Sequence, residues 1–112
     1  MNLLKETMSV LKEHGKKLND VQWFGCSEFV ISKDNFLACA DEDYDSGFGG
    51  QEVATDLLVV GNKWWLERHE YDGAEWWEYK ELPIKPNEER VVKRVMFGCW
   101  ETLGEINAED KE

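Results

Sequence analysis

An acidic loop carries the side-chain spacing that most closely matches a known chemical site. Counted from Asp41, carboxylates stand at positions 1, 3 and 5 (Asp41, Asp43 and Asp45), and Glu52 stands at position 12. This is the ligand spacing of an EF-hand calcium loop, in which alternating oxygens surround the ion and the last glutamate chelates it. The spacing therefore makes Asp41, Asp43, Asp45 and Glu52 candidate Ca²⁺ ligands, as an alternative to the primary expectation that the chain holds no cofactor.

The same loop departs from the EF-hand pattern in two ways. Position 6 is Ser46, where the EF-hand needs a glycine for its sharp turn. Residues 53–60 (VATDLLVV) predict a strand, where the EF-hand has its second helix. The alternative is a solvated, glycine-rich loop that holds no ion.

Four tryptophans form a second candidate site, for binding another protein. They stand as two adjacent pairs, Trp64 with Trp65 and Trp76 with Trp77. Because adjacent residues of a strand face opposite sides of a sheet, each pair puts one indole on each face. If helices cover only one face, the other carries exposed indoles, which mark an interface with a partner or a second copy of the chain. If helices cover both faces, all four indoles belong to the core.

The remaining reactive side chains predict no catalytic residue. His14 falls at the end of a predicted helix, where a cation caps the carbonyls, and His69 lies mid-strand among charged neighbours. A hydrolase centred on His69 would need a pocket and a nucleophile, and neither is indicated. The three cysteines, Cys26, Cys39 and Cys99, lack the short-spaced pairs of a zinc site. We therefore expect no enzyme, and free thiols in a cytoplasmic setting.

Local patterns predict the elements that must position these residues. Apolar residues at helical spacing predict a helix over residues 2–14, ended by Gly15, and Ser32 is a candidate N-cap for a short helix from Lys33 to about Ala40. Alternating and β-branched runs predict strands over Val21–Cys26, Glu28–Ser32, Leu57–Val60, Trp64–Tyr71 and Glu75–Lys80.

Two points of this assignment stay open in the sequence. Asp72-Gly73 predicts a hairpin, but a two-residue loop would pair Tyr71 with Ala74, whereas a three-residue loop would place Arg68 opposite Glu78. Residues 90–97 (RVVKRVMF) fit a helical face, although their β-branching favours a strand, which we predict.

Together these elements predict one α+β domain over residues 1–106. It would be an antiparallel meander of about five or six strands covered by the N-terminal helix and a second short helix. Residues 107–112 are expected to form a frayed acidic tail.

The charge of the chain disfavours nucleic acid as a partner. Asp and Glu number 24 against 13 Lys and Arg, a formal net charge of -11, whereas binding to a phosphate backbone depends on Lys and Arg. The excess is local, because residues 41–56 hold six acids and no base, and residues 101–112 hold five acids and one Lys. Apolar runs are far shorter than the ~20 residues that span a membrane, so no membrane partner is expected.

Residues 49–86 resemble a known group of proteins. The segment GGQE…DLLVVGNKWWLERHEYDGAEWWEYKELPIKP is similar to small proteins of Firmicute phages and prophages, which carry a GYGGQE-like segment before a WWLERHEYDG.EWWE hairpin. The resemblance implies a short accessory protein of a mobile element that acts inside a bacterial cell, and it implies no activity and no site residues. We therefore expect a non-enzymatic protein that binds a host or phage protein, or a second copy of itself, through the tryptophan hairpin and the acidic loop, and so modulates host machinery. The rival expectation is a calcium-binding domain.

Overall fold

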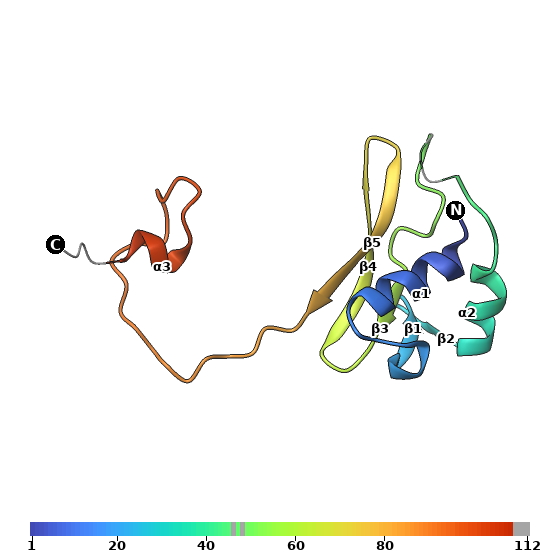
Figure 1. Ribbon diagram of the computed structural model, residues 1–112, viewed down its shortest axis with the longest axis horizontal. Helices are drawn as coiled ribbons and strands as arrows, with labels where there is room; N and C mark the ends of the chain where they lie inside the picture. The colour runs from blue at the N-terminus through green and yellow to red at the C-terminus, as the bar shows by residue number, and fades with distance from the viewer. Residues whose placement is uncertain (46, 48, 109–112) are drawn as a thin grey trace.

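The computed structural model describes residues 1–45, 47 and 49–108, and it confirms the predicted α+β fold (Figure 1). Five strands form one antiparallel sheet in the order β2-β1-β3-β4-β5. Along the chain the elements are α1 (Leu3–Glu13), the 3-10 turn η1 (Leu18–Asp20), β1 (Trp23–Gly25), β2 (Val30–Ile31), α2 (Lys33–Ala40), β3 (Leu58–Val60), β4 (Trp64–Tyr71), β5 (Ala74–Glu81) and α3 (Leu103–Ile106). No helix among these is long and apolar enough to cross a membrane.

The two predicted helices begin at side chains that satisfy their first backbone N–H groups. The side-chain oxygen of Asn2 accepts a hydrogen bond from the Lys5 N–H at 3.0 Å, and the Ser32 hydroxyl accepts one from the Asn35 N–H at 3.0 Å. Gly15 follows α1 with a φ of 70°, the left-handed conformation that ends many helices. The predicted boundaries of both helices are therefore confirmed to within a residue or two.

The β4–β5 hairpin closes through a two-residue turn. Asp72 and Gly73 both have positive φ values, 51° and 86°, as a type I′ turn requires. Tyr71 pairs with Ala74, and Arg68 pairs with Trp77 and not with Glu78. The structure thus selects the first of the two predicted registers.

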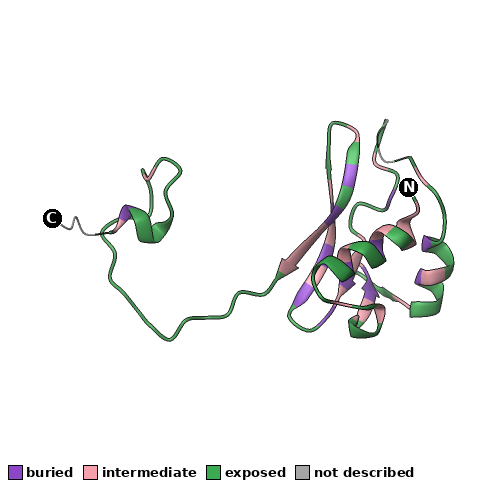
Figure 2. Cartoon of the chain, viewed as in Figure 1, coloured by how far each residue is buried: buried purple, intermediate pink, exposed green. Residues whose placement is uncertain are grey.

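One face of the sheet carries the hydrophobic core, because α1 and α2 pack on it (Figure 2). Alternate strand residues such as Val59 and Leu66 are fully buried there, beneath Leu11 of α1 and Phe36 of α2. The opposite face has no helix over it among the described residues. The other core members are Phe24, Ala40, Trp64 and Trp77.

The chain beyond β5 departs from the prediction. Residues 90–97 form no strand, so the strand predicted there is wrong, and residues 82–102 contain no helix or strand at all. Pro83 and Pro86 cannot donate to a sheet ladder, and the chain leaves the sheet edge after Glu81 (Figure 1). The Cα radius of gyration is 19.0 Å, against about 13 Å for a compact chain of this length. We call residues 1–81 the body and residues 82–108 the C-terminal arm. Residues 109–112, which belong to the predicted tail, lie outside the described residues.

A buried hydrogen-bond relay joins α1 to the sheet and can be tested. The Trp77 indole N–H donates to the Thr7 hydroxyl at 2.9 Å, and that hydroxyl donates to the Leu3 carbonyl at 2.7 Å. Thr7→Val keeps the shape of the side chain and leaves the indole N–H unpaired, which costs about 1–3 kcal/mol. We expect urea unfolding to show a loss of stability of that size.

Ser9→Val is the matched control, because Ser9 is exposed on the same helix. Surface changes of this kind lie within about 0.5 kcal/mol of neutral. Equal losses in the two variants would contradict the relay.

Candidate functional site

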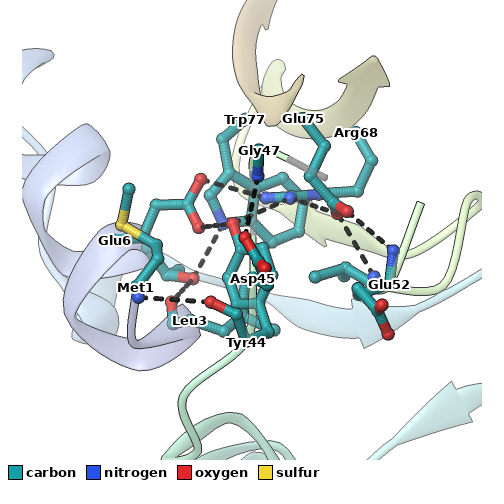
Figure 3. A network of polar contacts seen from close by, with 12 residues as sticks. Met1, Leu3, Glu6, Tyr44, Asp45, Gly47, Glu52, Arg68, Glu75 and Trp77 are labelled. Atoms are coloured by element: carbon teal, nitrogen blue, oxygen red, sulfur yellow. Dashed lines mark hydrogen bonds and ion pairs between the residues drawn. The ribbon is translucent and has the colours of Figure 1, made fainter. Parts of the chain in front are cut away.

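A buried arginine gathers polar groups from three other segments of the body (Figure 3). The side chain of Arg68, in β4, has no solvent exposure. Its guanidinium nitrogens lie 3.1 Å from a Glu6 carboxylate oxygen in α1 and 2.7 Å from a Glu75 carboxylate oxygen in β5. They also lie 3.2 Å from the Tyr44 hydroxyl. Arg68 Nε has no hydrogen-bond partner among the described residues, and the Trp77 ring covers the guanidinium with its centroid 4.9 Å from Cζ.

The Glu75 carboxylate ties the acidic loop to the hairpin. One oxygen accepts a hydrogen bond from the Glu52 N–H at 2.7 Å, and the other accepts one from the Val53 N–H at 3.2 Å in addition to the Arg68 contact. Burial by itself raises the pKa of Glu75, but these two amides and the guanidinium outweigh it and hold the pKa below its usual value. Glu75 is therefore a buried, ionised anchor for the end of the loop.

Tyr44 fixes the other side of the loop to the N-terminus. Its hydroxyl donates to the Glu6 carboxylate, and its backbone N–H donates to the Met1 carbonyl at 2.8 Å. The Met1 amino group in turn donates to the Tyr44 carbonyl at 3.2 Å. Burial and the neighbouring Glu6 carboxylate raise the pKa of Tyr44 to about 12. The phenol thus stays protonated at physiological pH and holds the loop against α1.

A cleft of about 520 Å³ opens between α2, the acidic loop and the segment that enters β3. Apolar and acidic residues both line it. Its apolar lining, which we call the floor, includes Leu3, Ile31, Phe36, Ala40, Val53 and Leu57, and its acidic residues are Glu42, Asp43, Asp45 and Glu52. We call this the acidic cleft.

The carboxylates of the acidic cleft are exposed and available to an external cation. Within the described part of the chain, the side chains of Glu42, Asp43 and Glu52 make no hydrogen bond and no ion pair. Asp45 accepts a single hydrogen bond, from the Gly47 N–H at 3.2 Å. No described cation neutralises them, so the cleft combines an apolar surface with unpaired negative charge.

Three of the four predicted calcium ligands line this cleft, and one does not. Asp43, Asp45 and Glu52 belong to its lining, whereas Asp41 accepts a hydrogen bond from the Asn2 side chain at 3.0 Å. In the described residues, no three His, Cys, Asp or Glu side chains are grouped so that they could share a metal ion. Ser46, at position 6 of the EF-hand count, lies outside the described residues. The calcium site stays a prediction from spacing alone.

The four hairpin tryptophans divide between the two faces of the sheet. Trp64 and Trp77 are each only 4% exposed and belong to the core, so they form no part of an exposed interface. Trp65 and Trp76 lie on the face without a helix, and Trp76 is 37% exposed. The alternation predicted for each pair is confirmed, and only one indole of each pair remains available to a partner.

Charged groups on that uncovered face pair with one another. His69 Nε2 lies 2.7 Å from a Glu67 oxygen, and its Nδ1 lies 3.1 Å from a Glu78 oxygen, which leaves Lys80 to pair with the other Glu78 oxygen at 3.2 Å. Hydrogen bonds from the Trp65 indole and then from His69 lower the pKa of Glu67. His69 is not among the residues that line the acidic cleft or the clefts around Lys12, Val91 and Phe29.

Comparison with known proteins does not assign a function to the acidic cleft or to the Arg68 network. No family model matches the chain, and neither a curated protein nor a solved structure matches it. The acidic cleft and the Arg68 network therefore have to be interpreted from their own contacts.

Sequence reasoning missed the Arg68 network, although a signal for it exists. Trp64, Leu66 and Arg68 are alternate residues of one strand, so they face the same side of the sheet. A face that begins with Trp and Leu is a core face, and an arginine that continues it must be buried and paired. The partners Glu6, Tyr44 and Glu75 could not be named, because they are far from this motif in the chain or on the next strand.

The lowered pKa of Glu75 predicts how stability depends on pH. The folded state favours the carboxylate, so this contribution is present above about pH 4.5, the usual pKa of the group, and is lost as the pH falls. Glu75→Gln leaves the buried Arg68 charge without one of its anions, which costs about 3–5 kcal/mol at neutral pH. We expect the difference in unfolding free energy between the two proteins to shrink as the pH is lowered towards 3.

Glu78→Gln serves as the control, because Glu78 lies on the same strand with a side chain that is 38% exposed. Its ion pairs are solvated and are worth less than about 1 kcal/mol. A loss in Glu75→Gln that stays constant from neutral to acidic pH would show that Glu75 is not ionised in the folded protein.

Proposed function

We propose that the chain is a non-enzymatic protein-binding module whose acidic cleft receives a partner segment with basic and apolar side chains. The observation that carries the proposal is the composition of the cleft, an apolar floor beneath four exposed carboxylates. Its volume of about 520 Å³ is within the range of ligand-binding sites. The hydrogen bonds of Tyr44 and Glu75, which hold the loop on either side of it, support a preformed site.

The chemistry of the lining favours a peptide segment over the other classes of ligand. Lys and Arg combine an aliphatic stem with a cationic head, so their side chains can bury apolar surface on the floor while the charge meets a carboxylate. Nucleic acid is disfavoured by the net charge of -11. A bare metal ion would not use the apolar floor.

A basic partner also agrees with the charge of the body as a whole. Residues 1–81 hold 17 acids and 8 bases, a net charge of -9, which would speed encounter with a positively charged protein. Together with the resemblance to phage and prophage proteins, this leads us to propose a host or phage protein in the bacterial cytoplasm as the partner. Occupying a basic surface on such a protein is a direct way to modulate host machinery.

Three blocked pentapeptides test the proposed chemistry of the cleft. The probes are Arg-Phe-Lys-Leu-Arg, its polar analogue Arg-Ser-Lys-Ser-Arg, and its acidic analogue Glu-Phe-Glu-Leu-Glu, each titrated while the backbone amides are followed by NMR. Because each buried apolar side chain contributes about 1.5–3 kcal/mol, we expect the first probe to bind at least about tenfold more tightly than the second. We expect no binding of the third, and shifts centred on Asp43, Ala54 and Leu57.

Variants of the cleft separate this site from general charge attraction. Asp43→Lys/Glu52→Lys reverses two carboxylates of the cleft, and Glu13→Lys/Glu28→Lys makes the same change in charge at exposed positions outside its lining. The proposal expects loss of binding only in the first variant. Equal weakening in both variants, or equal affinity for the first two peptides, would refute it.

A further inference from the structure

The C-terminal arm presents an apolar surface that nothing in the described chain covers. Val91 is 97% exposed, Phe97 is 85% exposed and Trp100 is 100% exposed, and Val95 and Met96 are exposed beside them. Several large apolar side chains left exposed within one short stretch of chain are typical of an interaction segment. The arm therefore has the composition of a segment that binds elsewhere.

The charge of this surface is opposite to that of the body. Residues 90–100 contain three bases, Arg90, Lys93 and Arg94, and no acid, which gives +3 against the -9 of residues 1–81. Residues 90–100 are thus a basic and apolar stretch within an arm whose four bases and four acids balance overall, and this stretch has the chemistry proposed for the occupant of the acidic cleft.

The arm holds its own local structure without help from the body. The side-chain oxygen of Asn107 accepts hydrogen bonds from the Lys93 and Arg94 N–H groups at 3.0 and 3.2 Å, and its amide group donates to the carbonyls of Arg94 and Leu103. The Ile106 side chain is only 8% exposed, packed within the arm beside Gly98. Residues 93–107 are therefore a small preformed unit, so less conformational freedom is lost when they dock.

The path of the chain separates the arm from the cleft of its own body. The Leu82 N–H donates to the Lys63 carbonyl at 2.8 Å, which fixes the exit of the arm at the end of the hairpin away from the turn. The cleft lies towards the turn, where Glu52 is bonded to Glu75. Residues 82–89 span at most about 28 Å when fully extended, and β5 alone has eight residues and covers about 26 Å. Reaching its own cleft would use the whole linker, yet the linker runs away from the body (Figure 1).

We propose that the arm docks in the acidic cleft of a second copy of this chain, so that two chains exchange arms and form a dimer. This inference rests on the proposed function of the cleft and names the occupant of that site. In the dimer, Lys93 faces the carboxylates of the cleft, Arg90 exchanges its ion pair with Glu88 of its own arm for one of them, and the exposed apolar side chains of the arm meet the floor. Exchange between two copies is reciprocal and closes a twofold dimer with both clefts filled.

A charge-swap experiment on the full-length chain tests the exchange. The arm variant is Arg90→Glu/Lys93→Glu, which leaves the Arg94 and Asn107 contacts of the arm in place, and the cleft variant is Asp43→Lys/Glu52→Lys. We expect sedimentation equilibrium to give a dimer for the wild-type chain, weakened by added salt, and a monomer for each variant alone. An equimolar mixture of the two variants restores the dimer, because the acidic arm of one fits the basic cleft of the other and the reverse pairing is also matched.

A third variant serves as the control for charge, and the outcomes below separate failure of the exchange from failure of the proposed function. Lys12→Glu/Lys17→Glu makes the same change in charge on the body as the arm variant and should stay dimeric. A wild-type chain of monomer mass, or a mixture of the two variants that stays monomeric, would overturn the exchange. If the pentapeptide binds the cleft while the chain is a monomer, only the exchange fails. If the dimer forms but neither variant weakens it and no peptide binds, the proposed function of the cleft fails as well.

Discussion

A guanidinium group without solvent exposure is the constraint on which the body of this protein depends. Dehydrating the Arg68 charge costs several kcal/mol unless anions and dipoles replace the lost water, and the body supplies Glu6, Glu75 and Tyr44. Each contact fixes one element: Glu6 sets α1 across the sheet, Glu75 sets β5 beside β4, and Tyr44 sets the acidic loop over α1. An arrangement that misplaced any of these segments would leave a buried charge without its partner.

Two of the residues that contact Arg68, Glu75 and Tyr44, also hold the loop that borders the acidic cleft. Glu75 accepts hydrogen bonds from the Glu52 and Val53 amides, and Tyr44 is bonded to Met1 on the other side of the loop. The loop is therefore held on one side by the buried Glu75 and on the other by the N-terminus and Glu6 through Tyr44. Its carboxylates point outward because the anion that the core needs is provided by Glu75, and the negative charge of the loop is left for a partner.

The parts of the fold that follow from local chemistry could be predicted from the sequence. Asn2 and Ser32 cap their helices and Asp72-Gly73 closes its hairpin through interactions within a few residues. The Arg68 network could not be predicted, because it joins positions up to 62 residues apart. The strand predicted over residues 90–97 failed for a related reason, since β-branching favours extended backbone but a strand also needs a neighbour to pair with. The spacing of the acidic loop predicts an ion site, which stays a prediction; the structure places Asp43, Asp45 and Glu52 in the lining of a cleft that also has apolar residues.

The sequence separations within the Arg68 network also impose an order in time. Arg68 and Glu75 are seven residues apart, Arg68 and Tyr44 are 24 apart, and Arg68 and Glu6 are 62 apart. A hairpin closes in about 1–10 μs, whereas contacts between distant residues must first overcome the entropy of closing a long loop. We therefore expect the β4–β5 hairpin to form first with its own ion pair and α1 to dock last. In that order, substitutions in the hairpin slow folding, and loss of the Glu6 contact accelerates unfolding.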